Sequence, residues 1–213
     1  MSDEVVIIEN AIKYYGSLYI LNNITVAFSK NKIYGIVGHN GSGKTIFLKC
    51  ICGLIPLNSG RVIVNNKIIG KDVDIADDIG IIIETPGFLP NYSGFRNLEF
   101  LASIRNKIDK KCIVDIMKLV GLDPQNKKHV AKYSLGMRQR LGIAQAIMEN
   151  NQILLLDEPM NGLDKQGIID INKLLIDLRN DGKTIILATH RNEDINDLCD
   201  VVYEIENGIM SKR

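Results

Sequence analysis

The most regular feature of the chain is a set of short apolar runs rich in Ile, Val and Leu. They predict strands at 33–37, 79–83, 153–156 and 184–188. The last three are almost continuously apolar, which is typical of strands buried on both faces. Near the end of the chain, Asn207 and Gly208 separate the β-rich runs 201–205 and 209–211. This dipeptide favours a two-residue hairpin turn.

Amphipathic segments alternate with these runs. They predict helices at 44–52, 134–148 and 166–180. In the last helix, one apolar stripe is formed by Ile168, Ile171, Leu174, Leu175 and Leu178. Because strands alternate with helices, the sequence predicts an α/β fold with a mainly parallel core sheet and helices on its faces.

Two stretches depart from the alternation. Residues 5–28 contain β-like runs interrupted by turn residues, so we expect an N-terminal antiparallel β portion made of short strands. Residues 86–133 have few strand signals and several prolines, which favours a helical subdomain inserted into the core at about 86–143. No repeat or linker divides the chain, and we expect a single domain over 1–213.

The composition of the chain mainly excludes certain classes of protein and site. Lys and Arg number 26 and Asp and Glu 25, so the basic excess of a nucleic-acid binder is absent and no nucleic-acid partner is expected. No apolar run approaches the roughly 18–20 residues that span a bilayer, and the start of the chain is acidic, so we expect a cytoplasmic protein. The four cysteines lack the spacing of a zinc site and are predicted to be small buried thiols.

The strongest chemical signal is the segment GHNGSGKT at 38–45, which fits the phosphate-loop pattern G-x-x-x-x-G-K-[ST]. It follows a predicted strand and opens a predicted helix, as the pattern requires. Its glycines allow backbone N–H groups to turn towards a phosphate, and the helix N-terminus adds its dipole. Lys44 is expected to reach the β- and γ-phosphates of a nucleotide, and the Thr45 hydroxyl to bind Mg²⁺.

A second signal follows the run 153–156, where Asp157 and Glu158 end four apolar residues. A buried parallel strand delivers such acids to the carboxyl edge of the sheet, where ligands bind in this fold class. Asp157 is predicted to hold Mg²⁺ through its water shell, and Glu158 to orient and deprotonate a water. The alternative is a strand end with two solvated acids.

His190 ends the next apolar run. A lone histidine is more often structural than catalytic, but this one belongs to the same expected sheet edge. We therefore predict that His190 donates a hydrogen bond to the γ-phosphate. The predicted catalytic residues are Glu158, His190 and Lys44.

Taken in order, these motifs resemble the nucleotide-binding subunit of an ATP-binding cassette (ABC) transporter over practically the whole chain. The resemblance also rests on the segment YSLGMRQR at 133–140 and on the turn NGLD at 161–164, which other phosphate-loop ATPases do not combine. It implies the phosphate-loop NTPase fold and an ATPase that uses ATP and Mg²⁺. It further implies that the chain powers a separate transmembrane permease from the inner face of the cell membrane.

The resemblance also assigns roles to residues. Tyr15 would stack on adenine, with Tyr14 as the competing candidate and a plain strand-face tyrosine as the alternative. Asp164 would lie in a turn that crosses the interface of a homodimer or heterodimer, unless it merely caps a helix. The segment that would contact ATP held by the opposite subunit is Ser134, Leu135, Gly136 and Met137. The ATP-binding set is Tyr15, Gly38, His39, Asn40, Gly41, Ser42, Gly43, Lys44, Thr45 and Ile46.

Two positions depart from the commonest family pattern. The signature usually reads Leu-Ser-Gly-Gly-Gln, whereas residues 133–137 read YSLGM. The loop after the third core strand carries Glu84 where a glutamine is usual. Both departures resemble the branch associated with bacteriocin, lantibiotic and peptide-antibiotic export or self-immunity. Glu84 would serve Mg²⁺ and the attacking water, with a salt bridge to the membrane partner as the alternative.

Two other functions are disfavoured. A soluble ABC ATPase that acts on ribosomes or DNA would carry tandem cassettes or long coiled coils, and this chain has a single cassette with almost no net charge. A GTPase would carry an Asn-Lys-x-Asp guanine reader. Here Asn66 and Lys67 are followed by Ile68 and Ile69.

Overall fold

The computed structural model describes residues 3–84, 87–191, 195 and 198–213. Its larger sheet has the strand order β10-β9-β3-β8-β7-β6. Neighbouring strands from β9 to β6 run parallel, and β10 pairs with β9 antiparallel. The strands are β3 (Ile33–Val37), β6 (Ile79–Ile82), β7 (Ile153–Asp157), β8 (Thr184–Thr189), β9 (Val201–Glu206) and β10 (Ile209–Lys212). The parallel core sheet expected from the sequence is thus confirmed, and the four predicted core strands differ from the observed ones by at most one residue.

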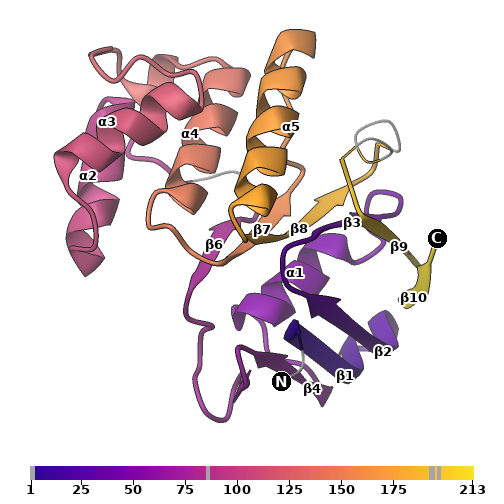
Figure 1. Ribbon diagram of the computed structural model, residues 1–213. Coiled ribbons are helices and arrows are strands. Elements are labelled where there is room, and N and C mark those ends of the chain that lie inside the picture. Colours follow the sequence, from indigo (N-terminus) through magenta and orange to yellow (C-terminus); the bar gives the residue numbers. More distant parts are fainter. Residues whose placement is uncertain (1–2, 85–86, 192–194, 196–197) are drawn as a thin grey trace.

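Both faces of the core sheet are covered, which explains its continuous apolar strands. In β7, Ile153 and Leu155 belong to the apolar cluster that contains α1 (Lys44–Cys52). Leu154 and Leu156 belong to a second cluster with the remaining helices. Figure 1 shows α4 and α5 above the sheet and α1 below it. Alternate residues of one strand therefore anchor opposite layers.

The upper layer contains the helices inserted between β6 and β7, together with the helix that follows β7. They are α2 (Gly94–Arg105), α3 (Lys110–Leu119), a 3₁₀ turn (Val130–Lys132), α4 (Leu135–Ile147) and α5 (Lys165–Asn180). Arg140 ties this layer together, because its guanidinium donates to the carbonyl of Val120 at 2.7 Å and lies 3.3 Å from the Asp170 carboxylate.

The N-terminal sheet corrects one expectation. It consists of β1 (Glu4–Tyr15), β2 (Leu18–Ser29), β4 (Ser59–Val64) and β5 (Lys67–Ile68), all antiparallel. The prediction of short strands over 5–28 is wrong, because β1 and β2 are 12 residues each. Asn10 and Asn23 adopt φ of 49° and 56° where the pairing register shifts. They are bulges that the hairpin absorbs rather than turns that end a strand.

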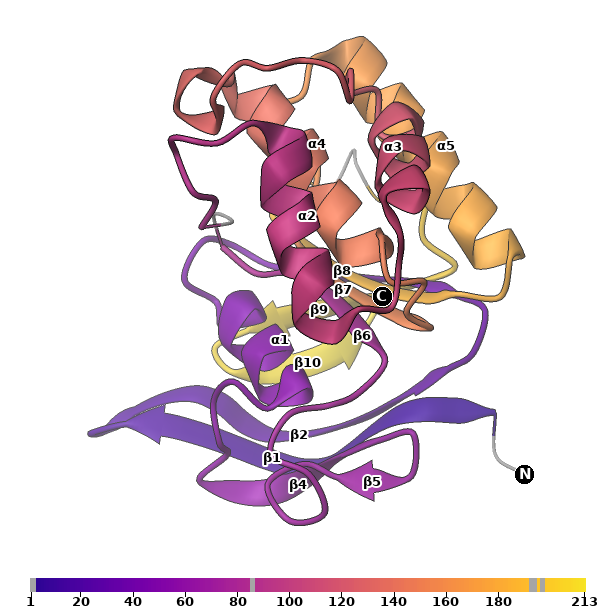
Figure 2. The ribbon, with the colours of Figure 1, turned by 90° about the vertical axis from the view of Figure 1, so that its left-hand side faces the viewer.

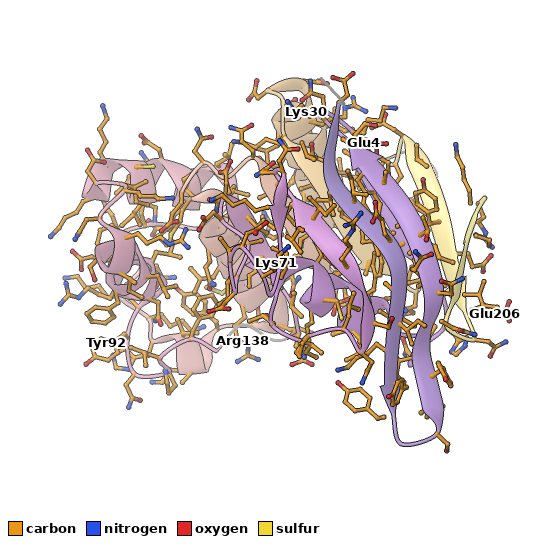
Figure 3. All side chains as sticks on the ribbon, turned by 90° about the horizontal axis from the view of Figure 1, so that it is seen from below. Glu4, Lys30, Lys71, Tyr92, Arg138 and Glu206 are labelled. Carbon is orange, nitrogen blue, oxygen red and sulfur yellow. The ribbon has the colours of Figure 1, made fainter. Side chains whose placement is uncertain are left out.

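The two sheets enclose α1, as the side view in Figure 2 shows. They also join at one edge, where the Asn22 N–H donates to the carbonyl of Gly208 at 2.7 Å. Gly208 and Asn207 form the predicted β9–β10 turn, with φ of 77° and 49°. Seen from below, the β1–β2 hairpin projects past the rest of the molecule, towards the same side as Arg138 (Figure 3).

Two smaller expectations concern membranes and thiols. No helix in the described part of the chain has both the length and the apolar character needed to cross a membrane. Cys50 and Cys52 are buried as predicted, and burial raises the pKa of the Cys50 thiol to about 12. Cys112 and Cys199 are only partly buried, so the prediction is wrong for these two.

Candidate active site

The phosphate loop (residues 38–45) connects β3 to α1 at the carboxyl edge of the core sheet. Gly43 is the N-cap of α1, with φ of 106° and no side-chain hydrogen bond to the helix end. A Cβ on Gly43 would lie 2.8 Å from the Ile20 carbonyl, and one on Gly38 would lie 2.4 Å from the Ile205 carbonyl. Glycine is therefore required at both positions. The uncapped helix end leaves backbone N–H groups for an anion.

Two buried polar groups of the loop are suited to a phosphate. The Ser42 hydroxyl is buried and has no hydrogen-bond partner among the described residues. The Lys44 ammonium donates to the carbonyls of Gly38 and His39, at 2.7 and 3.0 Å. Burial lowers the pKa of Lys44, against the opposing effect of Glu158 and Asp157. Because an unpaired buried hydroxyl and a desolvated ammonium are both costly, an anion here would stabilise the loop.

The loop also brings together two predicted magnesium ligands. The Thr45 hydroxyl donates to Asp157 Oδ2 at 2.6 Å, across α1 and β7. Burial raises the pKa of Asp157, and the Thr45 hydrogen bond works against that shift. Within the described ranges no cluster of three or more His, Cys, Asp or Glu side chains could hold a metal alone. Mg²⁺ normally completes its shell with water and substrate phosphates, so a hydroxyl and one carboxylate fit it.

Glu158 has an unusual backbone and a well-held side chain. Its φ is 50°, in the left-handed region, and its N–H donates to the Ala188 carbonyl at 2.8 Å. The His190 N–H and Nδ1 lie 3.0 and 2.7 Å from Glu158 Oε1, and the Thr189 hydroxyl donates to Oε2 at 3.2 Å. Left-handed backbone at a non-glycine residue clusters at functional sites. The structure thus brings Glu158 and His190 into direct contact.

Glu84 lies at the same sheet edge but has a different partner. Its carboxylate is 2.5 Å from the ammonium of Lys49, one helical turn beyond Thr45 on α1. The Glu84 side chain is 64% exposed, and its φ is 61°. Its backbone opposes the rise in the pKa of Asp157 that burial causes. Lys49 therefore neutralises the extra acid, and the role of Glu84 at Mg²⁺ stays a prediction.

Two clefts open on either side of the paired acids. One, of 240 Å³, is lined by Ile20, Asn40, Gly41, Gly43, Lys44, Thr45, Ile46, Asp157 and Glu158. The other, of 420 Å³, is lined by Glu84, Leu135, Arg138, Gln139, Asp157, Glu158, Asn161 and Gly162. Asp157 and Glu158 line both. The acids thus stand between the phosphate loop and the start of α4.

The signature segment (residues 134–137) begins α4. Ser134 is the predicted N-cap, and its hydroxyl accepts a hydrogen bond from the Met137 N–H at 3.2 Å. Leu135 is 55% exposed, whereas Gly136 approaches the turn before α5 so closely that a Cβ would lie 2.8 Å from the Gly162 carbonyl. Met137 packs half-buried against the helical core. The segment is held by its own chain while its outer face stays exposed.

The remaining predicted residues lie at the rim. Tyr14 and Tyr15 are exposed at the end of β1. The Lys13 ammonium lies 5.0 Å from the centre of the Tyr15 ring, and the Tyr14 ring packs against Tyr19. Asp164 is the N-cap of α5, and its carboxylate accepts a hydrogen bond from the Gly167 N–H at 2.8 Å, which both interpretations of this residue allow. Stacking of Tyr15 on adenine and an interface role for Asp164 stay predictions. His39 is exposed, with Nδ1 2.9 Å from the Asn40 carbonyl.

Two residues of this site were given no role from the sequence. Lys49 lies outside every motif. Gln139 lies within the segment 133–140, but no function was assigned to it, although it interrupts the apolar side of α4 and is buried. A buried amide on a helix needs hydrogen-bond partners, and this was the available signal.

The core is a parallel α/β sheet, a glycine loop follows β3 and opens a helix, and two acids end β7, which β8 separates from β3. Together these features define a phosphate-loop nucleotide hydrolase. The ABC transporter family matches residues 21–161, and the chain belongs to that family. Within it, the chain is an ATP-binding subunit and an ATPase.

Several relatives of known sequence are similar over most of the chain. An uncharacterized ABC transporter ATP-binding protein of Bacillus subtilis is 41% identical, over 93% of this chain and 91% of its own length. A bacitracin transport ATP-binding protein of Enterococcus faecalis is 39% identical, over 94% of this chain and 66% of its own length. A lantibiotic transport ATP-binding protein of Streptococcus pyogenes is 34% identical, over 94% of this chain and 86% of its own length.

Solved structures confirm the fold. A dimeric bacterial ABC transporter cassette superimposes with a TM-score of 0.87 at 24% identity, covering 97% of this chain and 98% of that one. The ATP-binding subunit of an ABC transporter gives 0.88 at 21% identity, over 98% and 89%.

Proposed function

We propose that this chain couples ATP hydrolysis to movement of a peptide antibiotic through a separate transmembrane permease, for export or self-immunity. The observation that carries the proposal is the convergence of the phosphate loop with Asp157 and Glu158. Similarity to bacitracin and lantibiotic transport proteins supports the substrate class. Glu84 in the place of the usual glutamine supports the same branch.

Hydrolysis in this site depends on positioning and on electrostatic stabilisation. The phosphates bind at the N-terminus of α1. Lys44 then donates its hydrogen bonds to phosphate oxygens in place of the Gly38 and His39 carbonyls. Thr45 and Asp157 would hold Mg²⁺, and the ion would offset the negative charge of the phosphates. Glu158 accepts a proton from the water that attacks the γ-phosphorus, and the bond to the ADP oxygen breaks to leave ADP and phosphate. The three hydrogen bonds to its carboxylate fix Glu158 for this task.

In the proposed dimer, the signature segment contacts the ATP that is bound by a second cassette. Its outer face is exposed, and the N-terminus of α4 attracts anions. Two cassettes, identical or different, would enclose two ATP molecules between the phosphate loop of one and the signature segment of the other. The assembly would lie at the cytoplasmic face of the membrane, where the permease holds it.

An apolar cleft of 250 Å³ is our candidate for the permease contact. It lies between the end of α1, the edge strand β6 and the helices α2 and α4. Leu54, Ile75 and Ile104 line it and are largely exposed, Ile104 by 76%. Exposed apolar side chains that gather at one cleft indicate a protein contact.

The experiment is reconstitution with a candidate permease, chosen from any neighbouring reading frame that encodes several membrane spans. The pair is expressed in a sensitive bacterium, and survival is scored against bacitracin and a lantibiotic. Protection by the native chain, with loss in Glu158→Gln at equal expression, is the expected result. No protection, together with ATP turnover that ribosomes or DNA stimulate, would favour the alternative of a non-transport ABC ATPase.

A further inference from the structure

Gln139, a buried side chain of α4, contacts the segment Glu158–Pro159 that follows β7. It is only 9% exposed, in the second turn of α4. Its amide nitrogen donates to the carbonyls of Glu158 and Pro159, at 3.2 and 3.0 Å. Both donor hydrogens of one amide thus serve two consecutive carbonyls. A buried amide satisfied in this way fixes the segment it contacts.

The segment it contacts is the one that most needs fixing. Left-handed backbone at a residue such as Glu158 costs about 1–3 kcal/mol and persists only where the surroundings hold it. The Ala188 carbonyl holds the N–H of Glu158, and Gln139 holds its carbonyl. The peptide that carries the carboxylate is therefore fastened on both sides, from β8 and from α4.

The same face of α4 also meets the turn before α5. Gly136 precedes Gln139 by three residues, which places the two on one side of the helix. Gly136 abuts the Gly162 carbonyl, and the Leu135 side chain would lie 2.3 Å from a Cβ on Gly162. A shift of α4 at the signature segment would therefore displace the backbone of Glu158 through these contacts.

We propose that Gln139 is a positioning residue for ATP hydrolysis, through which the helix of the signature segment sets the geometry of Glu158. Its contribution is to turnover and not to ATP binding, since Gln139 contacts neither the phosphate loop nor Thr45 in this structure. The transmission from the signature segment rests on the proposed function, because it requires a nucleotide of a second cassette. The effect of Gln139 on Glu158 rests only on the ATPase activity of this chain.

The test uses Gln139→Met, which keeps side-chain length and helix propensity but removes both donors. ATP turnover of the isolated chain is measured against ATP concentration, with binding measured separately by nucleotide fluorescence. We expect kcat to fall by about 10–100-fold, as small misplacements of catalytic groups do, with ATP affinity unchanged within about twofold. Gln125→Met makes the same substitution at an exposed glutamine in the loop after α3, is the matched control and should change neither quantity.

A second comparison separates positioning from general loss of structure. In a Glu158→Gln background, Gln139→Met should leave the residual turnover unchanged, because the base through which it acts is absent. Additive losses in the double variant, or a raised KM with normal kcat, would overturn the proposal. Should Gln139→Met not fold, Pro159→Gly loosens the same segment from the other side and should lower kcat alone. No permease or peptide is present in these assays, so failure of the transport proposal would leave their outcome untouched.

Discussion

Two helices begin at the nucleotide site, and they begin differently. α1 starts at Gly43 in a left-handed conformation with no side-chain cap, whereas α4 starts at Ser134, whose hydroxyl caps the Met137 N–H. The first end is buried in a cleft with Asp157 and Glu158 beside it. The second is capped and has an exposed outer face.

The difference indicates what each end is for. An uncapped, buried helix end is unfavourable until an anion binds it. We therefore expect the N-terminus of α1 to bind the phosphates of the nucleotide held by its own cassette. A capped, exposed end is stable without a ligand. The N-terminus of α4 is therefore stable without a ligand. It can contact a nucleotide bound by the second cassette, as the proposed dimer requires.

The largest expected effect removes turnover without altering either helix end. Glu158→Gln keeps the shape of the side chain and loses the proton acceptor, so turnover should fall by roughly 10²–10⁴-fold with ATP binding intact. Phosphate release assays and nucleotide fluorescence measure the two quantities. Turnover close to that of the native protein would show that Glu158 is not the base.

The next effect separates the two ends. In the Glu158→Gln background, added ATP should produce a dimer by light scattering, and Ser134→Arg should abolish it while the monomer still binds ATP. Loss of the cap should also lower Tm by about 2–4 °C, the equivalent of about 1 kcal/mol. Ser134→Thr keeps a capping hydroxyl and is the control. A monomer at saturating ATP before any change at Ser134 would point to a heterodimer instead.

A smaller effect is confined to α1. Lys44→Met should weaken ATP binding by about 10–100-fold, the value of a charged hydrogen bond of about 1.5–3 kcal/mol. Since burial lowers the pKa of Lys44, its charge is costly without ligand, and the nucleotide-free variant should melt no lower than the native protein. Thermal melts with and without ATP test this. An unchanged ATP-induced shift in Tm would contradict the assignment.

The smallest effect concerns Glu84, which lies between the two ends. Glu84→Gln should retain activity but shift the Mg²⁺ dependence of turnover to higher concentration, by a few-fold. Lys49→Met should shift it the other way, by up to about 5-fold, because an exposed ion pair that holds Glu84 away is worth up to about 1 kcal/mol. Superimposable Mg²⁺ titrations for the three proteins would leave Glu84 as a permease contact.

The sequence predicts the phosphate loop and both acids because each depends on local order along the chain. A strand, a glycine turn and a helix follow one another, and their geometry comes with the fold class. The same holds for the Ser134 cap and the Asn207–Gly208 turn, which short-range hydrogen bonds or backbone sterics determine.

The rest could not be predicted from local order. The length of β1 and β2 depends on pairing across bulges at Asn10 and Asn23, and these residues alone resemble strand ends. Gln139 reaches carbonyls about 20 residues further along the chain, and Lys49 reaches an acid 35 residues away. Such contacts exist only once the layers have packed.

The position of β3 in the core sheet has a consequence for synthesis of the protein. β3 lies between β8 and β9, so among the described residues the strand that precedes the phosphate loop pairs with 185–189 and 201–204. A chain that emerges from the ribosome N-terminus first can pair β1 with β2 at once. It cannot anchor the strand before the phosphate loop until roughly 150 further residues have been made, and closing such long separations is slow. A truncated translation product would therefore contain the entire phosphate-loop sequence and still lack a folded ATP site.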